Sequence, residues 1–431
     1  MKKTGEQKVT AQNADTENME IQNMETQNME TQNIKTQNMK TQATGTNHRN
    51  FRQISTQKLT QIVDPLLAWF DRNARILPWR ENPLPYNVWV SEIMLQQTRV
   101  EAVKPFFARF TEALPDVQAL AQCPEDRLLK LWEGLGYYNR VRNMQKAARV
   151  VVEQYGGRIP DRYEELIKLP GIGSYTAGAV ASIAYGRAVP AVDGNVLRVI
   201  SRISGYDGDI MKQSVRREFE KSLQEIMPEE SQQPYGRAPG CRNHPGAFNQ
   251  ALMELGATVC VPNGMPDCGR CPVSMFCSAK EQGCQMELPV KASKKERRVE
   301  IKTVFVIRDS GHAAVRKRPS GGLLAGLYEL PNVEGHLSSE EALEQVKRYG
   351  FTPLRIWPLA PAKHIFSHVE WQMTGYMAEV GDWGERSRAD MGDILFVDPE
   401  RTEREYPIPA AFAAYASYLS IRLGQDRYTE D

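Results

Sequence analysis

The chain has 431 residues, of which 41% are hydrophobic and 25% are charged. This length allows two or three domains, and the composition is ordinary for a globular protein. The sequence has no run of eighteen apolar residues, which argues against a membrane-spanning helix, and its polar N-terminus lacks the apolar core of a secretory signal. We therefore expect a cytoplasmic protein that does not associate with membranes.

The formal net charge is only +1, but charge is unevenly distributed along the chain. Residues 127–202 contain 12 Lys and Arg against 6 Asp and Glu, whereas residues 381–431 contain 6 against 11. The central segment can therefore meet a polyanion, which the C-terminal segment would repel. An ordinary fluctuation of charge explains the same counts equally well.

Residues 1–50 are of low complexity. The phrase Gln-Asn-Met-Glu-Thr occupies residues 22–26 and again 27–31, and no aromatic residue precedes Phe51. A five-residue period fits neither a helix nor a strand, and so polar a segment buries too little apolar surface to fold. We predict a disordered tail.

Residues 51–285 are predicted to form an all-α domain. Apolar residues recur at helical spacing, and short segments with Pro or Gly separate the helices. Residues 229–245, rich in Gln, Pro, Gly and Arg, are predicted to be an inserted surface loop. The predicted helices are Leu59–Phe70, Val88–Phe110, Arg127–Leu135, Val141–Tyr155 and Ser174–Tyr185.

A polar connector, residues 286–299, precedes a predicted α+β domain at residues 300–425. The apolar period there approaches two, which is typical of strands. The predicted strands are Thr303–Arg308, Ala313–Arg318, Leu323–Leu330 and His364–Tyr376, and the predicted helices are Ser339–Tyr349 and Ala410–Leu423.

A Leu-Pro-Gly-Ile-Gly turn at residues 169–173 lies between two predicted helices. Gly171 and Gly173 permit a tight hairpin whose exposed N–H groups, beside the helix that begins at Ser174, suit a phosphate. This is the layout of a helix-hairpin-helix element. A plain turn between helices is the ordinary alternative.

Two carboxylates lie in apolar surroundings. Glu92 is placed near the start of its predicted helix, one turn before the polar run Gln96–Thr98, and burial should raise its pKa as a general acid requires. Asp193 precedes the predicted helix Val196–Ile203. The ordinary explanations are a favourable helix dipole for Glu92 and an N-cap for Asp193.

Four cysteines, Cys260, Cys268, Cys271 and Cys277, fall within eighteen positions. Such clustering argues against a secreted disulfide framework and predicts a metal site. The spacing by itself fits either a tetrahedral zinc or a 4Fe–4S cluster. Cys123, Cys241 and Cys284 are interpreted as ordinary thiols.

In combination these motifs resemble the MutY family of adenine DNA glycosylases, within the helix-hairpin-helix superfamily that includes endonuclease III. The resemblance covers about residues 51–425 and includes Gly134–Tyr138 and Phe366–His368. It implies one 4Fe–4S cluster rather than zinc, and an enzyme, expected to be a monomer, that removes adenine mispaired with 8-oxoguanine or guanine in double-stranded DNA. The family usually has six residues between its first two cluster cysteines, whereas this chain has seven.

The resemblance also implies site residues. Glu92 would protonate N7 of adenine, and Asp193, with its pKa kept low, would stabilise the sugar oxocarbenium ion. Asn195 would position the water, and Tyr175 would assist. Gln97 and Tyr137 would wedge into the duplex, and Thr98 and Leu135 would lie near the opposite base. The implied adenine pocket comprises Trp79, Arg80, Val100 and Gln250.

The C-terminal domain resembles a Nudix fold, but Lys347 and Arg348 stand where Nudix hydrolases have paired glutamates. It is therefore interpreted as a recognition module in which Phe366, Ser367 and His368 read 8-oxoguanine. Two other functions remain open: an endonuclease III-like glycosylase and lyase acting on oxidised pyrimidines, and a DNA-binding protein without enzymatic activity.

Overall fold

The computed structural model describes residues 54–230, 245–292, 296–381 and 393–423. The predicted tail, most of the predicted insertion and Cys241 lie outside the described residues. Among the residues that are described, no helix is long and apolar enough to cross a membrane.

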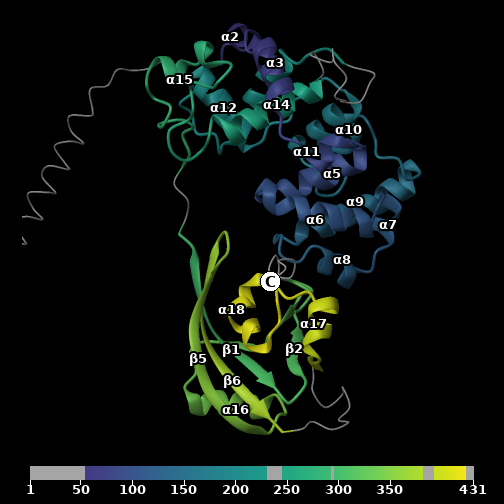
Figure 1. Ribbon diagram of the computed structural model, residues 1–431, viewed down its shortest axis with the longest axis vertical. Coiled ribbons are helices and arrows are strands. Elements are labelled where there is room, and N and C mark those ends of the chain that lie inside the picture. The colour runs from purple at the N-terminus through teal and green to yellow at the C-terminus, as the bar shows by residue number, and fades with distance from the viewer. Residues whose placement is uncertain (1–53, 231–244, 293–295, 382–392, 424–431) are drawn as a thin grey trace, which may run out of the picture. The chain divides into compact units, whose positions relative to one another are not determined.

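The first part of the chain is helical, as predicted (Figure 1). Its helices pack around two apolar clusters, one built largely on α5, α6 and α9 and the other on α3, α12 and α14. Met253 of α14 packs against both clusters, so the seam between them runs beside this residue. The helices are α2 (Thr56–Thr60), α3 (Val63–Asn73), α4 (Pro78–Glu81), α5 (Pro85–Leu95), α6 (Val100–Ala113), α7 (Val117–Gln122), α8 (Glu125–Leu131), α9 (Asn139–Tyr155), α10 (Tyr163–Leu166), α11 (Ser174–Ala179), a π-helical turn Val180–Ala184, α12 (Gly194–Ser204), α13 (Gln213–Gln224), α14 (Pro245–Thr258), a 3₁₀ turn Ser274–Phe276 and α15 (Ser278–Glu281).

The predicted single helix Val88–Phe110 is wrong. The chain forms α5 and α6, and between them Gln97 adopts a left-handed backbone with φ of 60°. Glu92 consequently lies in the second half of α5 rather than near a helix start, so a helix N-terminus does not explain its presence. The predicted helix Leu59–Phe70 is likewise divided into α2 and α3, and the helix predicted to reach Leu135 ends at Leu131.

The second part contains a seven-stranded mixed sheet with the order β3-β2-β1-β6-β5, in which β4 pairs with β1 and β7 with β2. Alternate residues of β1 face opposite layers: Val304 and Val306 contact the C-terminal segment, whereas Phe305 and Ile307 contact α16. The elements are β1 (Arg298–Arg308), β2 (Ala313–Lys317), β3 (Tyr328–Glu329), β4 (Asn332–Glu334), α16 (Ser339–Arg348), β5 (Pro353–Ile365), β6 (Val369–Val380), β7 (Ile394–Val397), α17 (Pro399–Glu405), α18 (Ala413–Ala416) and 3₁₀ turns at Ala410–Phe412 and Ser417–Leu419.

Three predictions for this part are wrong. The segment His364–Tyr376 is not one strand, because residues 366–368 form the turn between β5 and β6, closed by the Phe366 N–H donating to the Val369 carbonyl at 2.8 Å. Only Tyr328–Glu329 of the predicted strand Leu323–Leu330 is a strand, since Leu324 and Gly326 have positive φ. The predicted helix Ala410–Leu423 is a series of short turns.

Candidate active site

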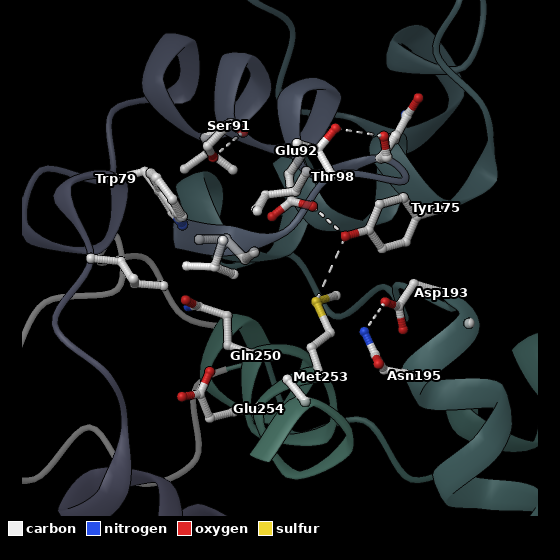
Figure 2. A pocket seen from close by; sticks show the side chains of 18 of the residues that line it. Trp79, Ser91, Glu92, Thr98, Tyr175, Asp193, Asn195, Gln250, Met253 and Glu254 are labelled. Carbon is white, nitrogen blue, oxygen red and sulfur yellow. Dashed lines mark hydrogen bonds between the residues drawn. The ribbon is translucent and has the colours of Figure 1, made fainter. Parts of the chain in front are cut away.

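A cavity of about 520 Å³ lies among α4, α5, α12 and α14 (Figure 2). Its volume is within the range of small-molecule sites. It brings together residues far apart in the sequence, including both candidate carboxylates. Among the predicted site residues, the cavity is lined by Trp79, Arg80, Glu92, Gln97, Thr98, Val100, Tyr175, Asp193, Asn195 and Gln250.

Glu92 is almost fully buried, with 5% of its surface exposed, and the Tyr175 hydroxyl donates a hydrogen bond to its Oε2. Burial raises the pKa of Glu92 to about 7; the hydrogen bond from Tyr175 opposes this shift and the charge of Asp193 adds to it. At neutral pH a substantial fraction of Glu92 is therefore protonated. A buried, protonated carboxyl in a cavity is suited to proton donation.

Asp193 is the N-cap of α12 and also faces the cavity. Its Oδ1 accepts from the Val196 N–H at 2.8 Å, and its Oδ2 accepts from the Asn195 amide at 2.7 Å. The expectation that its pKa is kept low is wrong: burial raises the pKa of Asp193 above its ordinary value, although these hydrogen bonds and the charge of Arg198 oppose the shift. Asp193 can be an N-cap and still act in the cavity, because the cap bond to the Val196 N–H uses only Oδ1.

The opposite wall of the cavity is held by a buried ion pair. Glu254 accepts from Arg75 Nη2 at 3.0 Å and from Arg80 Nη2 at 2.9 Å. Burial alone would raise the pKa of Glu254, but the hydrogen bonds and charges of both arginines lower it, so the carboxylate stays ionised. Arg80 Nε also donates to Gln250 Oε1 at 2.9 Å, which fixes the orientation of the Gln250 amide at the cavity wall.

Gln97 and Tyr137 each lie exposed on a turn, and both have positive φ, 60° and 48°. Thr98 lines the cavity with Gln97, whereas Leu135 and Tyr137 line a second cavity together with Phe366, Ser367 and His368. The hydroxyls of Tyr137 and Ser367 are hydrogen-bonded at 2.7 Å. Phe366 packs edge-on against Trp371 at 4.9 Å, so this ring has a structural partner, while Ser367 and His368 are exposed.

The predicted hairpin is present between α10 and α11. Gly171 has φ of 76°, and a Cβ there would lie 2.5 Å from the Cβ of Asn143, so only glycine fits. Gly173 is the N-cap of α11 and provides no side-chain cap. Gly173 therefore supplies no side chain to bind the first N–H groups of α11, which is what a phosphate-binding turn requires.

Cys260, Cys268, Cys271 and Cys277 line a single pocket. Within the described part of the chain, no three His, Cys, Asp or Glu side chains form a group that could hold one metal ion. A tetrahedral zinc needs its sulfurs within about 4 Å of one another, whereas a 4Fe–4S cluster spreads its four thiolates more widely. The four thiols supply the donor set that both kinds of centre use. Arg202 Nη1 donates to Cys260 Sγ at 3.3 Å, a contact suited to a thiolate.

Several residues at the site were missed. Met253 and Glu254 lie three and four residues after Gln250 on α14 and line the same cavity, so helical spacing from Gln250 could have identified them. Arg216, whose Nη1 donates to the Val192 carbonyl at 3.0 Å, also lines the cavity. No local pattern marks Arg216, because it approaches from α13.

Comparison with known proteins gives matches over both parts of the chain. Residues 90–225 match the family described as HhH-GPD superfamily base excision DNA repair protein, and residues 303–418 match the NUDIX domain. These two matches confirm the predicted fold class, an all-α helix-hairpin-helix domain followed by an α+β Nudix-like domain.

The chain is also similar to curated proteins named adenine DNA glycosylase. The protein of Rattus norvegicus is 36% identical over 363 residues, which is 71% of this chain and 68% of the relative. The Homo sapiens protein is 34% identical, with 76% and 68% covered, and the protein of Buchnera aphidicola subsp. Acyrthosiphon pisum is 32% identical, with 70% and 82% covered.

Proposed function

Since the chain belongs to the adenine DNA glycosylase family, we propose that it removes adenine opposite 8-oxoguanine or guanine from double-stranded DNA. The observation that carries the proposal is the pair Glu92 and Asp193 on one cavity, the first buried with a raised pKa and the second held by hydrogen bonds. We propose that the glycosylase domain comprises residues 51–285 and the recognition domain residues 300–425.

Removal of the base requires a proton for the departing adenine and a negative charge close to the sugar, which becomes positively charged. Glu92 in its protonated form donates to N7 of the extruded adenine, and Tyr175 keeps its carboxyl aligned. The Asp193 carboxylate then stabilises positive charge on the sugar, or traps it covalently, as the second carboxylate of a retaining glycosidase does. The Asn195 amide, donating to Asp193 Oδ2, orients that carboxylate and the attacking water.

Recognition requires that adenine leave the base stack. The residues assigned to the extruded base are Trp79, Arg80, Val100 and Gln250, which line the cavity. Gln97 and Tyr137, exposed on their turns, enter the duplex in its place, with Thr98 and Leu135 close to the opposite base. Gly171 and Gly173 present backbone N–H groups to a phosphate.

The function is tested on a duplex with A opposite 8-oxoguanine. Purified protein should release adenine and leave an intact abasic site, so strand breaks should arise only after alkali treatment. Lyases of this superfamily use a lysine amine to form a Schiff base, and Tyr175 stands at that position. Efficient borohydride trapping of a protein–DNA adduct would instead support the endonuclease III-like function, and release of no base would support a DNA-binding protein without activity.

We assign one 4Fe–4S cluster to Cys260, Cys268, Cys271 and Cys277. When bound, it supplies thiolate–iron bonds that cross-link the loop between α14 and α15, next to the apolar cluster on α12 and α14. Protein prepared without oxygen should contain about four irons per chain. Cys268→Ser should lower the iron content, whereas Cys123→Ser and Cys284→Ser should not, because those thiols are buried in packing. Stoichiometric zinc without iron would reverse the assignment.

The exposed pair Ser367 and His368 is assigned to reading 8-oxoguanine, since both side chains can hydrogen-bond the O8 atom and N7–H group that guanine lacks. Replacing both by Ala should reduce the preference for 8-oxoguanine over guanine by about tenfold, the value of one or two hydrogen bonds. The measurement is the ratio of single-turnover rates on the two duplexes. An unchanged ratio would place discrimination in the helical domain.

A further inference from the structure

Arg140, in the first turn of α9, has a side chain that connects two separate turns. Its Nη1 donates to the carbonyls of Ile93 at 2.7 Å, Met94 at 3.1 Å and Gln96 at 2.6 Å, at the end of α5. Its Nη2 donates to the carbonyls of Leu135 at 2.9 Å and Gly136 at 3.1 Å, just before α9. One guanidinium therefore satisfies five backbone acceptors from two parts of the chain.

Each of these turns carries a residue in the left-handed region. Gln97 directly follows one acceptor, and Tyr137 directly follows another. A non-glycine residue with positive φ is strained and persists only where the surroundings hold it. At both places a hydrogen bond from Arg140 holds the carbonyl that directly precedes this residue.

The guanidinium also contacts rings. It lies 5.3 Å from the ring centre of Trp132, which is fully buried, and 5.6 Å from that of Tyr137, which is half-exposed. Trp132 Nε1 donates to the Gly136 carbonyl at 3.0 Å, so this carbonyl accepts from both Trp132 and Arg140. Burial lowers the pKa of Arg140 to about 10, and the group therefore stays charged at neutral pH.

We propose that Arg140 is a positioning residue that couples the turn of Gln97 to the turn of Tyr137, so that both side chains enter the duplex as one rigid unit. This inference rests on the proposed function, which assigns those two side chains to the duplex. A lysine cannot replace Arg140, because one ammonium has three donors and no planar fork to span two turns.

The test uses the full-length protein and a duplex with 2-aminopurine, a fluorescent adenine analogue, opposite 8-oxoguanine. Arg140→Lys should slow the fluorescence rise that reports base extrusion by about tenfold or more, while the dissociation constant of the duplex changes by less than about threefold. The matched control is Arg149→Lys on the same helix. The Arg149 Nε donates to the Ala121 carbonyl at 3.2 Å, and within the described residues its side chain has no hydrogen bond to either turn. The control should extrude the base at the wild-type rate.

Coupling itself is measured by a double-mutant cycle. In the otherwise unchanged protein, the effects of Gln97→Ala and Tyr137→Ala on the extrusion rate should be non-additive, and in the Arg140→Lys background they should become additive. Equal coupling in both backgrounds, or an unchanged extrusion rate in Arg140→Lys, would overturn the inference. Adenine release from the normal substrate by the wild-type protein tests the proposed function separately, so the two failures are distinguishable.

If Arg140→Lys does not fold, the inference can still be tested on the wild-type protein. Amide hydrogen exchange in residues 95–99 and 134–138 reports the opening of each turn. Turns held by one guanidinium should open with the same free energy, so their protection should agree within about threefold and rise together when duplex is added. Independent opening of the two turns would overturn the proposal.

Discussion

Glu92→Gln should slow adenine release from the A·8-oxoguanine duplex by about a thousandfold or more, because an amide cannot donate the proton that the departing base needs. Burial raises the pKa of Glu92 to about 7, so the acid form is lost as the pH rises through that value. The wild-type single-turnover rate should therefore fall above about pH 7, and the residual rate of Glu92→Gln should show no such fall. Affinity for the duplex should be retained, since glutamine has nearly the same shape.

The free energy of unfolding of Glu92→Gln shows whether this variant is folded and whether the pKa of Glu92 is raised. The pKa of Glu92 is about 7 in the folded protein, above the ordinary value of 4.5 for glutamate, so the folded protein binds the proton more tightly than the unfolded protein does. The stability that this proton confers is present below the unfolded pKa and is lost as the pH rises to about 7. Glu92→Gln has no such penalty, and at pH 8 it should be more stable than wild type by up to about 3 kcal/mol. Release at the wild-type rate by this folded variant would contradict the assignment.

The chemistry of the site was largely evident from residue types. Four close cysteines predict a metal site from any single sequence, and Glu92 stands out because a carboxyl among apolar residues has few structural uses. The structure brings Glu92, Tyr175, Asp193 and Asn195 to one cavity, from α5, α11 and α12. These side chains lie together because of how the helices pack, and local periodicity carries no information about that packing.

The errors arise where a periodic pattern hides a turn. Apolar residues at helical spacing lie on both sides of the polar run Gln96–Thr98, yet α5 ends at Leu95, where the last carbonyls accept from Arg140, 44 residues beyond Gln96. The predicted strand His364–Tyr376 likewise runs across Phe366–His368, where the chain turns. A long-range contact marks the end of the first pattern at Gln96 and a local turn the end of the second at Phe366, and both places carry exposed residues that the proposed function uses.

The pKa of Asp193 was misjudged for a related reason. Its hydrogen bonds and the nearby Arg198 favour the ionised form, but burial by the surrounding helices outweighs them. A carboxylate with a raised pKa is less stabilised before the reaction and responds more strongly to a new positive charge. In the proposed mechanism the sugar oxocarbenium ion supplies that charge, so burial of Asp193 should contribute to stabilisation of the transition state rather than oppose it.

Asp193→Asn should therefore reduce the rate of base release by about a thousandfold, because the negative charge that stabilises the oxocarbenium ion is removed. Its fold should be preserved, since asparagine is as good an N-cap as aspartate and retains an oxygen for the Val196 N–H. Asp193→Ala removes both functions and should additionally lose about 1 kcal/mol of unfolding free energy. Single-turnover rates report the loss of the negative charge, and thermal unfolding of the two variants reports the loss of the N-cap.

If Asp193→Asn kept the wild-type rate while Asp193→Ala lost stability, Asp193 would act only as an N-cap, and the carboxylate that stabilises the sugar would be another residue of the cavity. Glu254, which also lines the cavity, is already paired with Arg75 and Arg80. Its charge is compensated before any substrate enters, which is why Asp193 rather than Glu254 is expected to act on the sugar.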